Sequence, residues 1–350
     1  MSIVSLIYTI LILCIVVVAH EFGHYIVAKS NGIYVKEFWV GFGPTLVSFT
    51  KNGTKFCLKP IPFGGACVFE DDPECDDPDK LFNKSGVFAR IMTTFAGPLF
   101  NIILAFVFSV LIVSLVPEGN IVSTEIVEVA KGSAAEEAGI EPGDIIKKYN
   151  SKNVGISTEV VLYTMTSGGE PVNVTIIRDG SEMVKVISPK YSEEYGRYMF
   201  GVTFGKSIDR SSSLNVLKYS GIYVRYNLRN TLEGLKTLFT GKFSMDNVSG
   251  PVGMAGMVSD VYNEAKQEGT SIVLLNMLNI ALLISASLGI MNLLPVPALD
   301  GGKLILLFVE AIRHKQISQD KETMINFIGF ALLMVLMLVV LYNDVLKFFK

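Results

Sequence analysis

The first thirty residues join an apolar segment long enough to cross a membrane to a metal-binding sequence. No charged residue occurs from Ile3 to Ala19, and the segment runs directly into HEFGH at residues 20–24. Histidines four residues apart lie on one face of a helix, where both can bind a single zinc ion. Ionisable side chains at membrane depth are costly and usually functional. The pattern therefore predicts a membrane-spanning helix in which His20 and His24 bind zinc.

Glu21 stands between the two histidines as the candidate catalytic residue. It lies close enough to the metal position to exchange a proton with a water that zinc activates. The alternative is that His20 and His24 are ordinary core residues. The chain has only three histidines, however, and a chance HExxH is expected about once in a thousand such chains. We interpret the third, His314, as a core residue with satisfied hydrogen bonds.

The composition indicates a membrane protein that also has soluble parts. Of 350 residues, 50% are hydrophobic and 18% are charged, too apolar for an ordinary soluble protein and too charged for membrane spans alone. The net charge of -3 and the lack of a basic stripe predict no nucleic-acid partner, and we expect no small-molecule cofactor. The four cysteines contain no CxxC pair, so we interpret them as free thiols.

Four segments are long and apolar enough to span the hydrocarbon core: Ile3–Ala28, Val87–Val116, Ile272–Leu294 and Ile325–Leu346. The first lacks the basic start of a cleaved signal, and cleavage would remove both histidines, so we expect it to be retained. The predicted fold is a polytopic α-helical membrane protein with about four transmembrane helices, a membrane-associated β-hairpin region and an inserted β-rich domain. The predicted divisions are 1–118 (two spans and hairpin), 119–192 (β-rich domain), 193–270 (juxtamembrane region) and 271–350 (two further spans).

The loop after the first span predicts a β-hairpin. Asn52-Gly53 separates the β-prone runs Leu46–Thr50 and Lys55–Ile61, the strongest short hairpin signal. Such a strand edge could pair with an extended substrate, which makes Asn52, Gly53 and the following Gly64-Gly65 candidate substrate-binding residues. The plainer alternative is turn formation and packing. We interpret the acidic run Glu70–Asp79 as a solvated linker.

The middle of the chain, Ile121–Lys190, predicts a small β-rich domain. Its run GSAAEEAGIEPGDII resembles the centre of a PDZ domain, and a hairpin of Val172–Ile177 and Met183–Ile187 turns at Asp179-Gly180. PDZ domains bind extended peptides at a sheet edge, although the domain could instead be a spacer that only limits access. Farther on, Leu214–Phe239 has apolar residues at helical spacing, which fits either a helix on the membrane surface or core packing.

A third zinc ligand is expected from the sequence NLLPVPALDGG at residues 292–302. Catalytic zinc usually has three protein ligands and one open position. Two prolines make this stretch non-helical at the membrane boundary, where irregular backbone is tolerated only beside a cavity or against protein. Spans one and three cross in the same direction, so Asp300 emerges on the same side as HEFGH. Asp300 is therefore the candidate ligand; the alternative is an ordinary capping aspartate.

HEFGH and NLLPVPALDGG together resemble the site-2 protease family of intramembrane zinc metalloproteases. The Gly-rich hairpin, AGPLFN on span two and the PDZ-like unit are similar to its bacterial regulator-of-sigma-factor branch. The resemblance implies a three-helix core, zinc, and cleavage of single-pass proteins such as anti-sigma factors or signal-peptide remnants within the membrane. It matches His20, His24 and Asp300 to the zinc ligands, Glu21 to the catalytic acid/base and Asn292 to a residue that holds the substrate strand.

Charge bias predicts the orientation. Lys51, Lys55 and other basic residues lie between spans one and two, and none precedes Lys29, so the positive-inside rule places the site toward the cytoplasm. The expected location is a bacterial plasma membrane, in contact with lipid, with the PDZ-like domain outside.

Competing classes of protein are an inactive membrane-helix binder, a zinc transporter and a PDZ scaffold. An inactive binder would usually lack Glu21 or a metal ligand. A zinc transporter would need polar groups along a path through several spans. A PDZ scaffold would not need HExxH.

Overall fold

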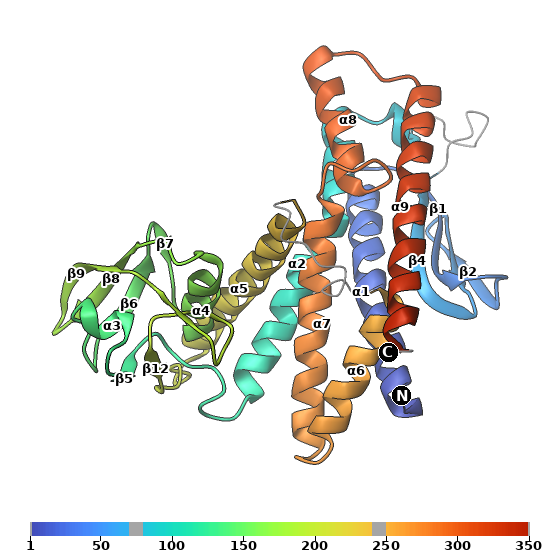
Figure 1. Cartoon of the computed structure of the whole chain (residues 1–350). Coiled ribbons are helices and arrows are strands. Elements are labelled where there is room, and N and C mark those ends of the chain that lie inside the picture. The colour runs from blue at the N-terminus through green and yellow to red at the C-terminus, as the bar shows by residue number, and fades with distance from the viewer. Residues whose placement is uncertain (1, 70–79, 240–249, 349–350) are drawn as a thin grey trace. The chain divides into compact units, whose positions relative to one another are not determined.

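The computed structural model describes residues 2–69, 80–239 and 250–348, so the acidic run Glu70–Asp79 lies outside the described residues. The chain divides into two compact units (Figure 1). Unit 1 combines Met1–Phe108 with Lys236–Lys350, and unit 2 is Ser109–Leu235.

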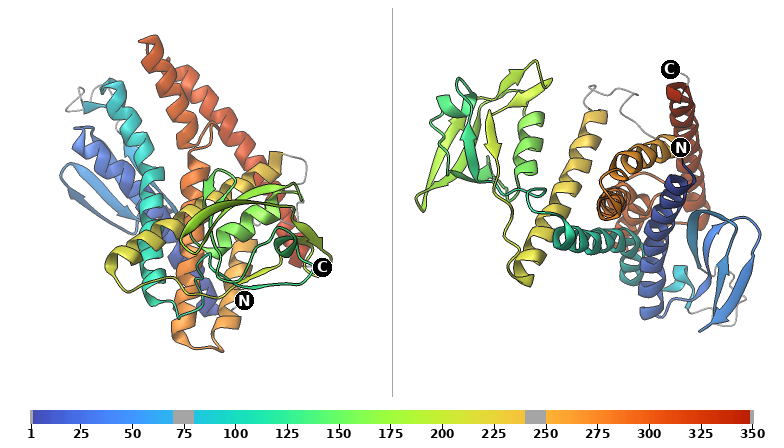
Figure 2. Two further views of the ribbon diagram at one scale, coloured as in Figure 1. Left: turned by 90° about the vertical axis from the view of Figure 1, so that its left-hand side faces the viewer. Right: turned by 90° about the horizontal axis from the view of Figure 1, so that it is seen from below.

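Four helices are long and apolar enough to cross a membrane, which confirms the predicted number of spans. They are α1 (Ile3–Ser30), α2 (Val87–Leu115), α7 (Thr270–Asn292) and α9 (Gln319–Phe348). Ser2 caps the start of α1 by accepting a hydrogen bond from the Ser5 amide. Figures 1 and 2 show α1, α2 and α7 as neighbours within unit 1. The protein is therefore a multi-pass helical membrane protein with β-sheets in both units.

Small residues bring the helices of unit 1 close together. A Cβ on Gly23 of α1 would lie 2.5 Å from the Ala96 carbonyl oxygen of α2. A Cβ on Gly289 of α7 would lie 3.1 Å from the Pro98 carbonyl oxygen, also on α2. Small residues allow such close approach of membrane helices, where packing rather than the hydrophobic effect drives association. Span two is thus held against both helices that lead to the metal-binding sequences.

The loop after α1 forms a four-stranded sheet with the order β2-β3-β1-β4. Its strands are β1 (Val35–Phe42), β2 (Val47–Lys51), β3 (Thr54–Leu58) and β4 (Ile61–Phe69). The predicted hairpin is confirmed: β2 and β3 are antiparallel, and Asn52 and Gly53 turn with φ of 51° and 77°. The sequence reasoning missed β1 and missed that the Gly64-Gly65 stretch belongs to a strand, β4. The sheet lies beside α1 (Figures 1 and 2), and β4 packs on α1 more extensively than β1 does.

One side of this sheet exposes large apolar side chains, which suits a region in contact with lipid. They are Phe42, Leu46, Val47, Phe49, Leu58 and Ile61, each about half exposed or more.

Helix α8 (Asp300–Arg313) follows the proline-containing loop and is too short to span a bilayer. Glu310 on α8 forms a buried ion pair with Arg90 on α2, with Arg90 Nη1 3.2 Å from Glu310 Oε2. A second contact joins Arg90 Nη2 to Glu310 Oε1. This pair fixes α8 against span two. The interpretation of His314 as a core residue is wrong, because it ends α8 as an exposed residue in the left-handed conformation.

The other elements of unit 1 are the short helix η2 (Phe82–Lys84) and α6 (Pro251–Ala265), which packs on α1 and α7. Asp344 of α9 is buried and accepts a hydrogen bond from the Gly253 amide in the first turn of α6.

Unit 2 contains a small β-rich fold whose described strands form three sheets. Strands β6, β7, β8 and β9 form one sheet in the order β7-β6-β8-β9, β5 pairs with β12 in the second, and β10 pairs with β11 in the third. The hairpin predicted at Asp179-Gly180 is confirmed as β8–β9. The elements are β5 (Ile126–Val129), α3 (Ala134–Glu137), β6 (Ile145–Tyr149), β7 (Lys152–Asn153), α4 (Ser157–Thr166), β8 (Val172–Arg178), β9 (Ser181–Ile187), β10 (Lys190–Ser192), β11 (Arg197–Met199) and β12 (Val202–Phe204).

The predicted amphipathic helix is present as α5 (Ser213–Phe239). Arg225 and Arg229 on α5 donate hydrogen bonds to Glu159 of α4, whose side chain is fully buried. A buried carboxylate requires such partners, so α5 is fastened to the β-rich fold by charge-assisted hydrogen bonds. Packing therefore accounts for part of the helical pattern.

Candidate metal centre

The three predicted metal ligands converge although they are far apart in the chain. His20 Nε2 and His24 Nε2 on α1 lie 3.3 Å apart. Asp300 Oδ2, from the first residue of α8, lies 3.1 Å from His20 Nε2 and 3.5 Å from His24 Nε2. All three side chains are at least four-fifths buried. Two imidazoles and one carboxylate are a typical catalytic zinc set, with a position left for water.

The loop before α8 folds tightly enough to aim Asp300 at α1. Prolines 295 and 297 prevent helix α7 from continuing, and Ala298 takes a positive φ of 74°. A Cβ on Gly301 would lie 2.2 Å from the Leu294 carbonyl oxygen, and one on Gly302 would lie 2.3 Å from that of Val296. The two glycines after Asp300 are therefore required by the close return of the backbone.

The donor atoms fit a zinc ion. Asp300 Oδ2 is buried and has no hydrogen-bond partner among the described residues, although both histidine nitrogens are near it. Such an oxygen is costly unless it binds a cation. Cys67 also borders the site, but burial raises the pKa of its thiol and the charge of Glu21 raises it further. Among the described residues, the ligand atoms that lie within 4.8 Å of one another come from His20, His24 and Asp300, and Cys67 is not part of this group.

Helix α2 shapes the space around the imidazoles. His24 Nδ1 lies 2.8 Å from the Thr93 carbonyl oxygen, to which it can donate a hydrogen bond that leaves Nε2 free for metal. A Cβ on Gly97 would lie 2.2 Å from His24 Nε2 and 2.8 Å from His20 Cε1. In the sequence, Gly97 suggests only close helix packing. In the structure it also provides the room for both rings.

On α1, the Glu21 side chain faces strand β4 of the sheet. Its Oε2 accepts a hydrogen bond of 2.9 Å from the Cys67 amide of β4. A Cβ on Gly65 would lie 3.2 Å from Glu21 Cγ, so β4 passes close to the carboxylate. Glu21 borders a cavity of about 270 Å³ that the three metal-ligand residues also line. The carboxylate is thus placed to act on a molecule held at the metal.

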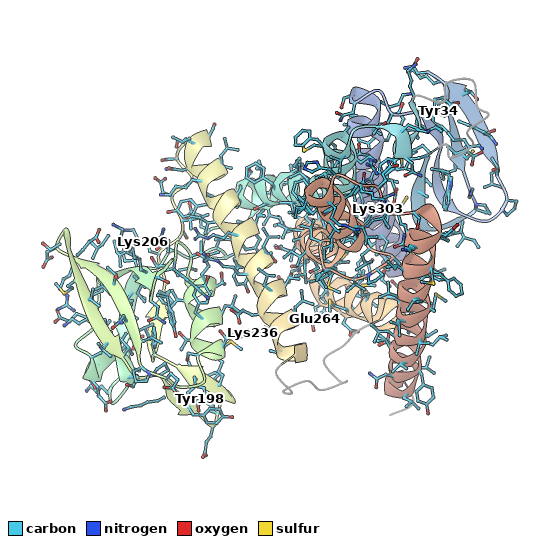
Figure 3. The ribbon with its side chains drawn as sticks, turned by 90° about the horizontal axis from the view of Figure 1, so that it is seen from above. Tyr34, Tyr198, Lys206, Lys236, Glu264 and Lys303 are labelled. Atoms are coloured by element: carbon cyan, nitrogen blue, oxygen red, sulfur yellow. The ribbon has the colours of Figure 1, made fainter. Side chains whose placement is uncertain are left out.

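The cavity contains one more predicted residue and one that was missed. Asn292, at the end of α7, lines it, and its role in holding the substrate strand stays a prediction. Lys303, labelled in Figure 3, also lines it, and its Nζ lies 4.1 Å from the centre of the Phe82 ring. Its position one helical turn after Asp300 was the only sequence signal for it.

The remaining substrate-binding candidates are not brought together. Gly64 lies on β4 beside Phe42, next to Gly65. Asn52 and Gly53 form the turn between β2 and β3, which the sheet order separates from β4 by β1. Their carbonyl oxygens accept hydrogen bonds from Lys29 and Tyr34 instead. A role for this turn in substrate binding stays a prediction.

Comparison with known proteins identifies the class. The sequence matches Peptidase family M50 over residues 8–336, nearly the whole chain, and the chain belongs to that family. It is a zinc metalloendopeptidase of the site-2 protease type, with zinc as its cofactor.

Similar proteins occur in several bacteria. A candidate zinc metalloprotease of Clostridium acetobutylicum is 32% identical over 99% of this chain and 98% of its own length. The zinc metalloprotease RasP of Bacillus licheniformis is 29% identical over 97% of this chain and 98% of its own length. The regulator of sigma-W protease RasP of Bacillus subtilis is 29% identical over 94% and 95%. The two RasP alignments exceed 400 residues, so these relatives contain segments that the present 350-residue chain lacks.

Gly97→Ala tests the geometry of the metal centre. The added methyl group would overlap the imidazoles, so we expect the affinity for zinc to fall about tenfold or more. Zinc bound to the purified protein after dialysis against a weak chelator measures the effect. Gly256→Ala is the control, because a Cβ there meets no atom within 4 Å. Equal zinc retention by both variants would show that the rings do not need this space.

Proposed function

We propose that the protein hydrolyses peptide bonds within the transmembrane segments of single-pass membrane proteins. The observation that carries this is the position of the metal centre on membrane-spanning helices. His20 and His24 belong to the span Ile3–Ser30, and the cavity beside them is bordered by Thr93 of α2 and Asn292 of α7. A bond that reaches this cavity must come from a chain at or near membrane depth.

The chain's own residues supply the proton transfers. Zinc, when bound, activates water and polarises the scissile carbonyl. Glu21 takes the proton from the attacking water and delivers it to the leaving amine. The Cys67 amide fixes the direction of the Glu21 carboxylate before substrate arrives. His20, His24 and Asp300 hold the metal.

The free edge of β4 is the proposed place for the substrate backbone. A helical substrate has its peptide bonds shielded, so it must become extended before attack. Among the described residues, β4 pairs with β1 alone, and the Cys67 amide points away from β1, toward Glu21. A strand added at this edge would run past Gly64 and Gly65 close to the metal. Asn292 would hold the far side of that strand.

Unit 2 is proposed to be a PDZ-like domain that selects substrates. A groove lies between α4 and β12, lined by Val160, Val161 and Thr164 on one side and Gly201, Val202 and Phe204 on the other. Among the described strands, β12 pairs with β5 alone, which leaves an edge for an extended peptide. The domain would span about 121–208, because β11 and β12 lie beyond residue 192. It would filter substrates by an exposed carboxyl end or by size.

The proposed setting is a bacterial plasma membrane, with the metal centre toward the cytoplasm and the PDZ-like domain outside. The basic residues between α1 and α2 support this orientation. Similarity to the regulator of sigma-W protease supports anti-sigma factors as substrates, and signal-peptide remnants are a second group. The membrane lipid surrounds α1, α2, α7 and α9.

Glu21→Gln should abolish cleavage while zinc remains bound, because the ligands stay and the proton carrier is lost. We expect cleavage of a single-pass substrate in proteoliposomes to fall ~10²–10⁴-fold, while zinc content matches the wild type. His20→Ala should lose both zinc and cleavage. Undiminished proteolysis by Glu21→Gln would refute the mechanism. Cleavage confined to soluble substrates would refute the intramembrane assignment.

Cysteine labelling of intact cells tests the orientation. In a background without native cysteines, an impermeant thiol reagent should label Ser181→Cys directly and Lys51→Cys only after permeabilisation. Both positions are exposed, so access depends on the side of the membrane. Labelling of Lys51→Cys alone in intact cells would reverse the proposed topology.

Filling the groove of unit 2 tests its proposed role. Val161→Trp should weaken binding of a fluorescent apolar peptide with a free carboxyl end about tenfold, a loss of ~1.4 kcal/mol. Fluorescence anisotropy with the full-length protein measures it. Val184→Trp, at a largely exposed position on β9, is the control. If both variants bind like the wild type, or if amidating the peptide's carboxyl end changes nothing, the groove does not recognise that end.

A further inference from the structure

One face of α2 meets the metal-binding histidines at three points. Thr93, Gly97 and Asn101 follow one another at intervals of four residues, which places them on the same side of the helix. Thr93 provides the carbonyl oxygen for His24, and Gly97 provides the space for the rings. Asn101 is fully buried, and the zinc-binding sequences give it no role.

The geometry of the centre fixes which ring nitrogens carry protons. The Nε2 atoms of His20 and His24 converge on Asp300 Oδ2, so zinc binds through Nε2. An imidazole that binds metal through Nε2 carries its proton on Nδ1, which then needs an acceptor. For His24 that acceptor is the Thr93 carbonyl oxygen, at 2.8 Å. His20 requires an equivalent partner.

Asn101 is the residue next to that nitrogen. Its Nδ2 lies 3.1 Å from His20 Nδ1, and its buried Oδ1 has no partner among the described residues. The oxygen and nitrogen of an amide are assigned from their hydrogen bonds, and a half-turn about the last bond exchanges them. After that half-turn, Oδ1 faces Nδ1–H of His20 and can accept its proton. We propose that Asn101 is the positioning residue of His20, whose amide oxygen keeps Nε2 free to bind zinc.

The backbone of Asn101 is itself held by α7. Ser285 Oγ donates a hydrogen bond of 2.8 Å to the Asn101 carbonyl oxygen. A Cβ on Gly289 would lie 3.4 Å from Asn101 Cβ, so the two helices touch at this point. The Ser285 hydrogen bond ends on the Asn101 backbone, and the side-chain amide that faces His20 is not part of it. Hydrogen bonds from such outer residues orient the ring and raise its basicity as a ligand.

A second explanation for a buried asparagine in a membrane protein is helix association. Polar side chains can join transmembrane helices by hydrogen bonds without any role in chemistry. The two explanations differ in what an aspartate at this position would do. Asp retains an acceptor for His20 Nδ1–H but has no amide donor. Leu is close in size and has neither, and Ala removes the group altogether.

The test compares zinc affinity in four variants of the full-length protein purified in detergent. Competition with a chromophoric chelator should show the zinc dissociation constant raised ~10–100-fold for Asn101→Leu and Asn101→Ala. Asn101→Asp should stay within about threefold of the wild type. Ser285→Ala is the matched control, because it removes the hydrogen bond to the Asn101 backbone and leaves the amide. Its affinity should equal that of the wild type.

The absorption spectrum of cobalt(II)-substituted protein gives a second readout of ligand geometry. The spectra of Asn101→Asp and Ser285→Ala should match the wild type, and that of Asn101→Ala should shift. If Asn101→Leu does not fold, as judged by its melting curve without metal, Asn101→Ala and Asn101→Asp still decide the question. Wild-type zinc affinity in Asn101→Ala would overturn the proposal. So would an equal loss in Asn101→Asp and Asn101→Ala, which would indicate helix association instead.

Discussion

The structure depends on bringing three candidate metal-binding side chains together inside a bundle of apolar helices. An imidazole or carboxylate in this setting is costly unless its polar atoms find partners. The close contact of α1 with α2 at Gly23 and Gly97 makes this convergence possible. It leaves room for two imidazoles, and it places α2 backbone and side-chain atoms where the rings need hydrogen bonds. A larger residue at either glycine would separate the helices or displace the rings.

The third ligand arrives by a different physical route. Residues 293–299 are non-helical, and irregular backbone at this depth is tolerated because it packs against protein beside a cavity. Two glycines let the loop return onto the start of α8. The buried Arg90–Glu310 pair then holds the far end of α8 against α2. Asp300 is thereby fixed between a compact loop and an anchored helix, although the ion pair lies three helical turns away from it.

The two units contribute different kinds of specificity to the proposed protease. In unit 1, β4 lies beside Glu21 and offers main-chain groups, which recognise an extended backbone whatever its side chains. In unit 2, the groove beside β12 has apolar walls and can discriminate between side chains. Glu159 connects the groove helix α4 to α5 through two arginines. The proposed function thus places substrate choice and bond cleavage in separate parts of the chain.

The sequence by itself determined the four spans and both hairpins, and it singled out the candidate metal ligands and Glu21, because these depend on local periodicity, turn residues and short motifs. HEFGH needs only one helical turn, and Asn52-Gly53 needs only one tight turn. The tertiary structure decided what faces them. Strand β4, rather than the hairpin turn, lies beside Glu21, and Asn101 and Lys303 border the metal centre. Such neighbours come from packing between segments distant in the chain, which no local pattern encodes. For the same reason the sequence did not show that His314 ends α8 as an exposed residue.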